Sequence, residues 1–207
     1  MRALLLLALS VLCSAQNDPF LNMQTIASSL GVECQYCHGE GRNAKRVIAR
    51  AMIAMTREMN TKVKDVAGKQ AAVGCITCHR GVPIPKPLGD VLWDTTRTQG
   101  PAAAITQYRD LRTRFFGKAA YDFSEQTLLT LSQRIANARP DDAIAFAKLN
   151  LEFFPKSSAS YQAVAFAYTR KVDDASAIEA LEKAVELDPA NNVARGQLEQ
   201  LKSYRRR

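Results

Sequence analysis

Two five-residue stretches hold nearly all the side chains in this sequence that could bind a redox cofactor. Residues 34–38 read Cys-Gln-Tyr-Cys-His, and residues 75–79 read Cys-Ile-Thr-Cys-His. Cys-x-x-Cys-His is the attachment signature of c-type haem, in which two thiols bond to one porphyrin and the histidine binds its iron. The sequence therefore predicts two covalently bound haems c. Their thioether bonds would come from Cys34, Cys37, Cys75 and Cys78, and their proximal ligands would be His38 and His79.

Cysteines in this arrangement have two other uses. Four cysteines in two Cys-x-x-Cys pairs could hold one structural zinc ion, and a single pair could form a redox-active or structural disulfide. Neither alternative explains why a histidine directly follows each pair. Together the two motifs contain both histidines of the chain and four of its five cysteines.

The distal side of each iron needs a ligand other than histidine, because both histidines are used proximally. Methionine opposite histidine is a ligand pair of electron-transfer cytochromes. Met23 precedes the first motif, and we expect it to serve the first haem. Met52, Met55 and Met59 precede the second motif, and their periodicity does not choose among them. An iron whose two axial positions are both occupied by protein side chains has no position for a substrate. Two such irons predict an electron carrier and not an enzyme. A diheme peroxidase, with one iron open to substrate, is the alternative.

The N-terminus predicts export. Arg2, the apolar run 3–12 and the small residues around Ala15 are typical of a secretory signal peptide of residues 1–15, too short to span a bilayer. Cleavage is favoured over lipidation at Cys13, and no later stretch predicts a transmembrane helix. We expect an exported protein that is located in the periplasm or at the cell surface and that can associate with the membrane. The formal net charge of +8 then indicates propionate pairing or an acidic redox partner, and not nucleic acid.

Helices must position the two motifs. Asn17-Asp18-Pro19 predicts a helix from Pro19 to Leu30 that ends at Gly31 and carries Met23. From Ala44 the apolar residues recur at helical spacing, with Asn43 as a cap. Residues 81–87, Gly-Val-Pro-Ile-Pro-Lys-Pro, predict an extended connector. The first domain is thus expected at residues 16–87. It would consist of two similar units, each a methionine-bearing helix followed by an attachment motif.

The remainder of the chain predicts further helices, so the fold class is mainly α. Residues 88–120 are expected to form a bridge with one helix, from Pro101 to near Gly117. Pro155 and Pro189 lie 34 residues apart and each ends a helical pattern, a period typical of tetratricopeptide repeats. Residues 121–207 are therefore expected to form tetratricopeptide-like repeats with a closing helix at 193–204. Such repeats predict a surface for docking proteins.

One stretch of the first domain resembles a known family. Residues 49–60, Ala-Arg-Ala-Met-Ile-Ala-Met-Thr-Arg-Glu-Met-Asn, followed by residues 74–81, Gly-Cys-Ile-Thr-Cys-His-Arg-Gly, resemble the cytochrome c subunit of photosynthetic reaction centres. The resemblance covers about residues 20–87. It implies that a methionine-bearing helix precedes each attachment motif, and it assigns Met23 to the first haem and Met52 to the second. Met55 is the fallback for the second.

Two departures from that family shape the expected function. Its photosynthetic members carry four haems, whereas this chain has motifs for two. The family pattern also places a histidine where this chain has Val66, and the missing ligand agrees with the missing haems. The resemblance implies a carrier of single electrons between redox proteins. Its partners would be a reaction centre or respiratory complex and a soluble cytochrome.

Overall fold

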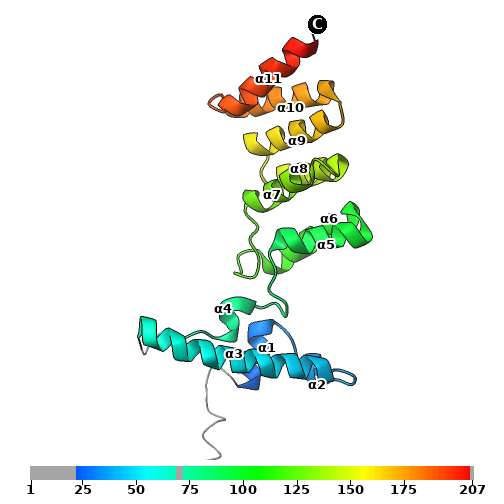
Figure 1. The fold of residues 1–207 in the computed structure, drawn as a ribbon. Coiled ribbons are helices and arrows are strands. Elements are labelled where there is room, and N and C mark those ends of the chain that lie inside the picture. Colours follow the sequence, from blue (N-terminus) through cyan, green and yellow to red (C-terminus); the bar gives the residue numbers. More distant parts are fainter. Residues whose placement is uncertain (1–21, 69–71, 206–207) are drawn as a thin grey trace, which may run out of the picture. The chain divides into compact units, whose positions relative to one another are not determined.

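A computed structural model describes residues 22–68 and 72–205 of the chain (Figure 1). Within these residues the regular elements are eleven α-helices, and no strand is present. The mainly α fold class is confirmed. The chain divides into two compact units, the first ending at Pro85 and the second beginning at Lys86. No helix among the described residues is both long enough and apolar enough to cross a membrane.

The first unit holds the two attachment motifs, and each motif is itself a short helix. α1 packs against α4, and α2 packs against α3. The long helix α3 carries three of the candidate methionines. The four helices of this unit are α1 (Met23–Leu30), α2 (Gln35–His38), α3 (Asn43–Ala67) and α4 (Cys75–His79).

The start of α1 differs from the expected position. Asn22 has extended backbone dihedral angles (φ −74°, ψ 156°), and its side chain accepts a hydrogen bond from the Thr25 N–H at 2.8 Å. It is therefore the N-cap, and the helix begins at Met23 and not at Pro19. The end at Gly31, in the left-handed conformation, is confirmed. The signal peptide 1–15, Cys13 and Pro19 lie outside the described residues.

The second unit is a series of antiparallel helix pairs (Figure 1). Its first pair lies in the segment 88–120, where the sequence predicted only one helix. The additional helix, α5, is short of strong helix formers but buries Leu88, Leu92 and Thr96 at four-residue spacing. The helices are α5 (Leu88–Gln99), α6 (Pro101–Phe115), α7 (Glu125–Ile135), α8 (Pro140–Phe153), α9 (Ser158–Arg170), α10 (Asp174–Leu187) and α11 (Asn192–Arg205).

Two apolar clusters hold the second unit together. The first joins Leu92 of α5 and Tyr108 of α6 to Leu128 of α7 and Phe146 of α8. The 88–120 segment is therefore part of the same core as the helices that follow it. The second cluster joins α9, α10 and α11 through small residues such as Ala177 and Ala184, which allow close helix approach. α8 and α10 end just before Pro155 and Pro189, as the 34-residue period predicted.

Candidate haem-binding site

The second motif forms one turn of helix that places both thiols on the same side. Cys75 and Cys78 are three residues apart in α4, and side chains at this spacing share a helix face. The Gly74 N–H donates to Thr77 Oγ at 3.1 Å, which fixes the start of the turn. Burial raises the pKa of the Cys75 thiol; its backbone hydrogen bond opposes this shift, and nearby Cys78 adds to it. No disulfide joins the described cysteines.

His79 is held in an orientation suited to binding iron. Its ring is buried, and Nδ1 lies 3.0 Å from the carbonyl oxygen of Val82. A carbonyl only accepts hydrogen bonds, so Nδ1 must carry the proton. The lone pair is then on Nε2, the nitrogen left for a metal. Sequence reasoning identified His79 but missed Val82, which acts through its backbone and leaves no signal in residue type.

The first motif folds in the same way but is more exposed. Cys34 has helical dihedral angles, and the His38 N–H donates to its carbonyl at 2.9 Å, so the thiols again share one turn. Lys45 of α3 places its ammonium group 3.6 Å from the centre of the Tyr36 ring. The Arg42 guanidinium donates to the Tyr36 carbonyl at 3.4 Å. These contacts attach α2 to the beginning of α3.

The far end of α3 is attached to the second motif. The Asn60 side chain donates to the Val73 carbonyl at 2.9 Å and accepts from the Val73 N–H at 2.6 Å. The amide thus pairs with both backbone groups of a residue two positions before Cys75. Sequence reasoning missed Asn60, because a polar residue at this point of an amphipathic helix has no distinctive pattern.

The two halves of the first unit also meet through their glycines. The Gly81 N–H donates to the Ser29 carbonyl at 2.8 Å. A Cβ atom on Gly31, where φ is +63°, would lie only 2.2 Å from the Gly81 carbonyl oxygen. Gly31 precedes the first motif and Gly81 follows the second. The segments that flank the two motifs are therefore in direct backbone contact.

The candidate methionines differ in burial. Met23 opens α1 and is 60% exposed, and Met55 is 43% exposed. Met52 is half-buried, and its carbonyl accepts the hydroxyl of buried Thr56 at 2.8 Å. Direct packing pairs α1 with the attachment helix of the second motif and α3 with that of the first. The hydrogen bonds of Asn60 additionally connect α3 to the second motif.

The first unit has the side chains that a haem needs but little apolar interior. Its buried hydrophobic residues are Ile26 and Val82, while Val47, Ile48 and Ile76 are more than half exposed. Thiol sulfur, imidazole nitrogen and thioether sulfur are the donor set of a c-type haem. A porphyrin would also cover apolar side chains of this kind. Among the described residues no group of three or more His, Cys, Asp or Glu side chains is gathered to hold a metal ion. The residues thus fit haem c better than a shared zinc ion.

Comparison with known proteins agrees with this donor set. Residues 39–135 match the family model described as "Photosynthetic reaction centre cytochrome C subunit". This stretch of the chain is similar to that family. The match begins directly after the first motif, includes the whole of the second, and continues through α7. The resemblance placed at about residues 20–87 is therefore confirmed, although its limits differ.

Two curated relatives carry the name "photosynthetic reaction center cytochrome c subunit". One, from Rubrivivax gelatinosus, is 37% identical over 75 residues, which are 34% of this chain and 19% of the relative. The other, from Roseobacter denitrificans, is 27% identical over 129 residues, which are 54% of this chain and 35% of the relative. The chain therefore spans only about a fifth and a third of the lengths of these two relatives. A cytochrome c family carries electrons by means of covalently bound haem.

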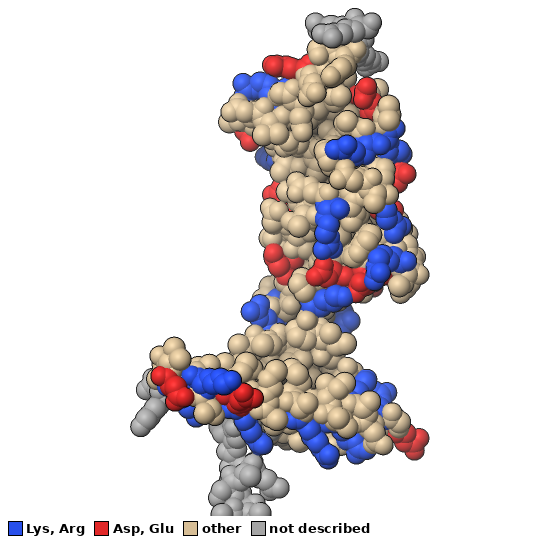
Figure 2. All heavy atoms as spheres, in the orientation of Figure 1, with Lys and Arg blue, Asp and Glu red and all other residues tan. Residues whose placement is uncertain are grey.

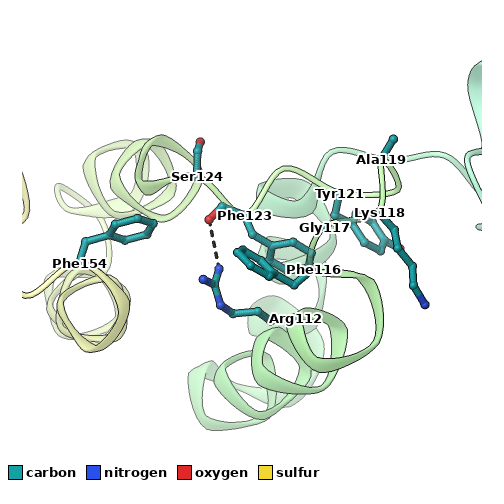
Figure 3. Close-up of a pocket in the computed structure, with 9 residues that line it drawn as sticks. All are labelled: Arg112, Phe116, Gly117, Lys118, Ala119, Tyr121, Phe123, Ser124 and Phe154. Atoms are coloured by element: carbon teal, nitrogen blue, oxygen red, sulfur yellow. Dashed lines mark hydrogen bonds between the residues drawn. The ribbon is translucent and has the colours of Figure 1, made fainter.

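The second unit also contains a cavity, most of whose lining lies within the matched residues 39–135. This cavity, of about 530 Å³, lies beside the loop between α6 and α7 (Figure 3). The Arg112 guanidinium lies 4.2 Å from the centre of the Phe116 ring and donates to the Phe123 carbonyl at 3.2 Å. The walls are mostly aromatic and apolar. The lining residues are Arg112, Phe116, Gly117, Lys118, Ala119, Tyr121, Phe123, Ser124 and Phe154.

Proposed function

We propose that the protein is a diheme c-type cytochrome that carries single electrons between redox proteins outside the cytoplasm. The observation that supports this most directly is the setting of His79: its Nδ1 faces the Val82 carbonyl at 3.0 Å, directly after two thiols that share one helical turn. A histidine oriented through its other ring nitrogen is typical of metal ligands. The first motif repeats the same local fold.

The proposed roles follow from the chemistry of each side chain. The thiols of Cys34 and Cys37, and of Cys75 and Cys78, would bind the two porphyrins covalently. His38 and His79 would be the proximal ligands, and Met23 and Met52 the distal ligands of the first and second haem. Each bound haem supplies an iron that exchanges one electron between its ferrous and ferric states. Val82 and Asn60 would orient the second site.

The haem count and the ligands are tested by optical spectra of protein matured with haem. A pyridine haemochrome assay should give two haems per chain. Met23→Ala and Met52→Ala should each remove part of the sulfur-to-iron charge-transfer band, whereas Met55→Ala should preserve it. A single haem, or loss of the band only in Met55→Ala, would overturn the corresponding assignment.

The pairing of methionine with motif requires a second set of variants, because α1 packs on α4 and α3 on α2. In a Cys34→Ala/Cys37→Ala background only the second haem is attached. Met52→Ala should then abolish the charge-transfer band, and Met23→Ala should leave it. The reverse result would show that each distal ligand comes from the helix preceding the other motif.

The partners are proposed from the family and from the second unit. We propose a photosynthetic reaction centre or a respiratory complex as one redox partner and a soluble cytochrome as another. The repeat-like helices would supply a protein-docking surface. They carry a groove of about 540 Å³ that includes Tyr161 and Tyr168 of α9 and Lys183 of α10. Tyrosine and basic side chains at such a groove suit protein recognition.

A further inference from the structure

Four basic side chains form a narrow line along α3. Arg46, Arg50, Arg57 and Lys64, here called the basic stripe, all lie in this 25-residue helix. At about 100° of rotation per residue, they fall within about 40° of arc and extend over about 27 Å. All four residues are exposed. Figure 2 shows basic side chains on the visible surface of the first unit.

The charges of the stripe are not neutralised by neighbouring carboxylates. α3 contains six basic residues and two acidic ones. Of the acidic pair, Glu58 binds Lys62 at 2.9 Å, and Lys62 is not a member of the stripe. Within residues 22–68 and 72–205 no ion pair involves the four members. The stripe therefore presents uncompensated positive charge to the solvent.

The stripe does not face the haem ligands. Met52, Met55 and Met59 lie on the opposite side of α3, about 180–240° around the helix axis from Arg46. A haem held by one of these methionines would lie on the side of α3 away from the stripe. Pairing with the propionates of that haem is therefore not the expected role of the stripe. Because a helix is about 10 Å across, a protein docked on the stripe would still be one helix diameter from that haem.

We infer that the basic stripe of α3 is the docking surface for an acidic redox protein, an inference that rests on the proposed electron-carrier function. Rows of like charge raise the association rate with an oppositely charged partner and release it readily, as transient electron exchange requires. An anionic membrane is the competing occupant. Helices that lie on membranes place aromatic and apolar anchors beside their basic residues. α3 has no aromatic residue, and its methionines are on the far side.

The test measures electron transfer by stopped flow from a reduced, acidic flavodoxin to the oxidised haem-loaded protein, over a range of ionic strength. The stripe variant is Arg50→Gln/Arg57→Gln/Lys64→Gln. The control, Arg114→Gln/Lys118→Gln/Lys156→Gln, removes the same charge from the second unit. We expect the second-order rate constant of the stripe variant to fall about tenfold at low salt and to lose most of its salt dependence. The control should stay within about twofold of the parent protein, as for ordinary surface changes.

Each result has a distinct meaning. A stripe variant whose rate constant and salt dependence match those of the parent overturns the docking surface. So does a control that falls as far as the stripe variant, because net charge alone would then account for the effect. If the stripe variant loses binding to vesicles containing phosphatidylglycerol but keeps its flavodoxin kinetics, a membrane and not a protein occupies the stripe. A matured protein without c-type haem bands would overturn the proposed function itself.

Discussion

Gly31 and Gly81 touch through their backbones: a Cβ on Gly31 would lie 2.2 Å from the Gly81 carbonyl oxygen. Gly31 ends the helix that carries Met23, and Gly81 follows the turn that carries His79. Neither glycine belongs to a motif, yet their contact fixes where the first methionine helix lies against the second attachment helix. The stability of both candidate haem sites should therefore depend on this one contact.

Gly31→Ala should lower the unfolding free energy of the first unit by more than the left-handed φ at residue 31 alone would cost. The left-handed φ of +63° costs an L-residue about 1–2 kcal/mol, and the overlap with Gly81 adds about 1–3 kcal/mol. Gly41→Ala is the matched control, because its φ is +68° and its Cβ would meet nothing within 4 Å. Denaturant unfolding of the two variants should separate the contributions. Equal losses of unfolding free energy would mean that the contact is not tight.

Asn60→Ala should loosen the approach to the second motif. It removes both hydrogen bonds to Val73 and should lower the free energy of unfolding by about 1–3 kcal/mol. Asn60→Asp keeps the acceptor but loses the donor, so it should fall between Asn60→Ala and the parent. The reduction potential of the second haem should shift in the same order. Thr61→Ala, at the neighbouring exposed position, should change neither quantity; if it does, the effect is not specific to Val73.

Val172→Gly should stabilise the second unit. Val172 lies in the turn between α9 and α10 with φ of +59° and is 84% exposed, so its β-branched side chain contributes strain and little burial. We expect a gain of about 1 kcal/mol. Val193→Gly makes the same chemical change at another exposed valine, in the first turn of α11, and should instead cost up to about 1 kcal/mol. Thermal unfolding of both variants checks the opposite signs.

Asp122 should make the stability of the second unit depend on acid pH. Its carboxylate accepts the Ser124 N–H at 2.8 Å, which holds the pKa of this group below its usual range. A carboxyl whose pKa is lower in the folded state stabilises the fold above its unfolded pKa, about 3.9, and loses that contribution as the pH falls below it. Asp122→Ala should therefore lower Tm at pH 6, and the difference from the parent should shrink below about pH 4. A Tm difference that stays constant below pH 4 would contradict this.

A chain truncated after Pro85 should fold, whereas a chain truncated after residue 119 should not. A chain ending at Pro85 contains the first unit alone and should retain its haem spectrum but lose partner binding through the repeats. Deleting residues 120–207 would remove Leu128 and Phe146 from a core that also contains Leu92 and Tyr108. That variant should expose apolar surface and aggregate, as judged by size-exclusion chromatography. A monodisperse 1–119 chain would show that α5 and α6 do not need the later helices.

The positions where sequence and structure agree are those where one residue type determines the local geometry. Gly31 ends α1, Pro101 begins α6, and the 34-residue spacing of Pro155 and Pro189 matches the ends of α8 and α10. The start of α1 was misplaced because the expected cap was taken from Asn17-Asp18-Pro19, whereas the Asn22 side chain caps the helix through the Thr25 N–H. α5 was missed because its three threonines and one glycine have low helix propensity. Burial of its apolar face stabilises the helix in spite of this.

The candidate site shows the same division. Cysteine, histidine and methionine are recognisable in a sequence as possible haem ligands, so the sequence was sufficient to propose them. The residues that orient them are not recognisable by type. Val82 acts through a carbonyl, and Asn60 through an amide that could stand at any exposed helix position. Their roles arise from segments far apart in the chain and require the folded structure.

The exchanged packing of the first unit, α1 on α4 and α2 on α3, has an evolutionary consequence. The first half of the unit (α1 and α2) and the second half (α3 and α4) each pack mainly against helices of the other half. A haem could therefore not be gained or lost from this unit by inserting or excising one half alone.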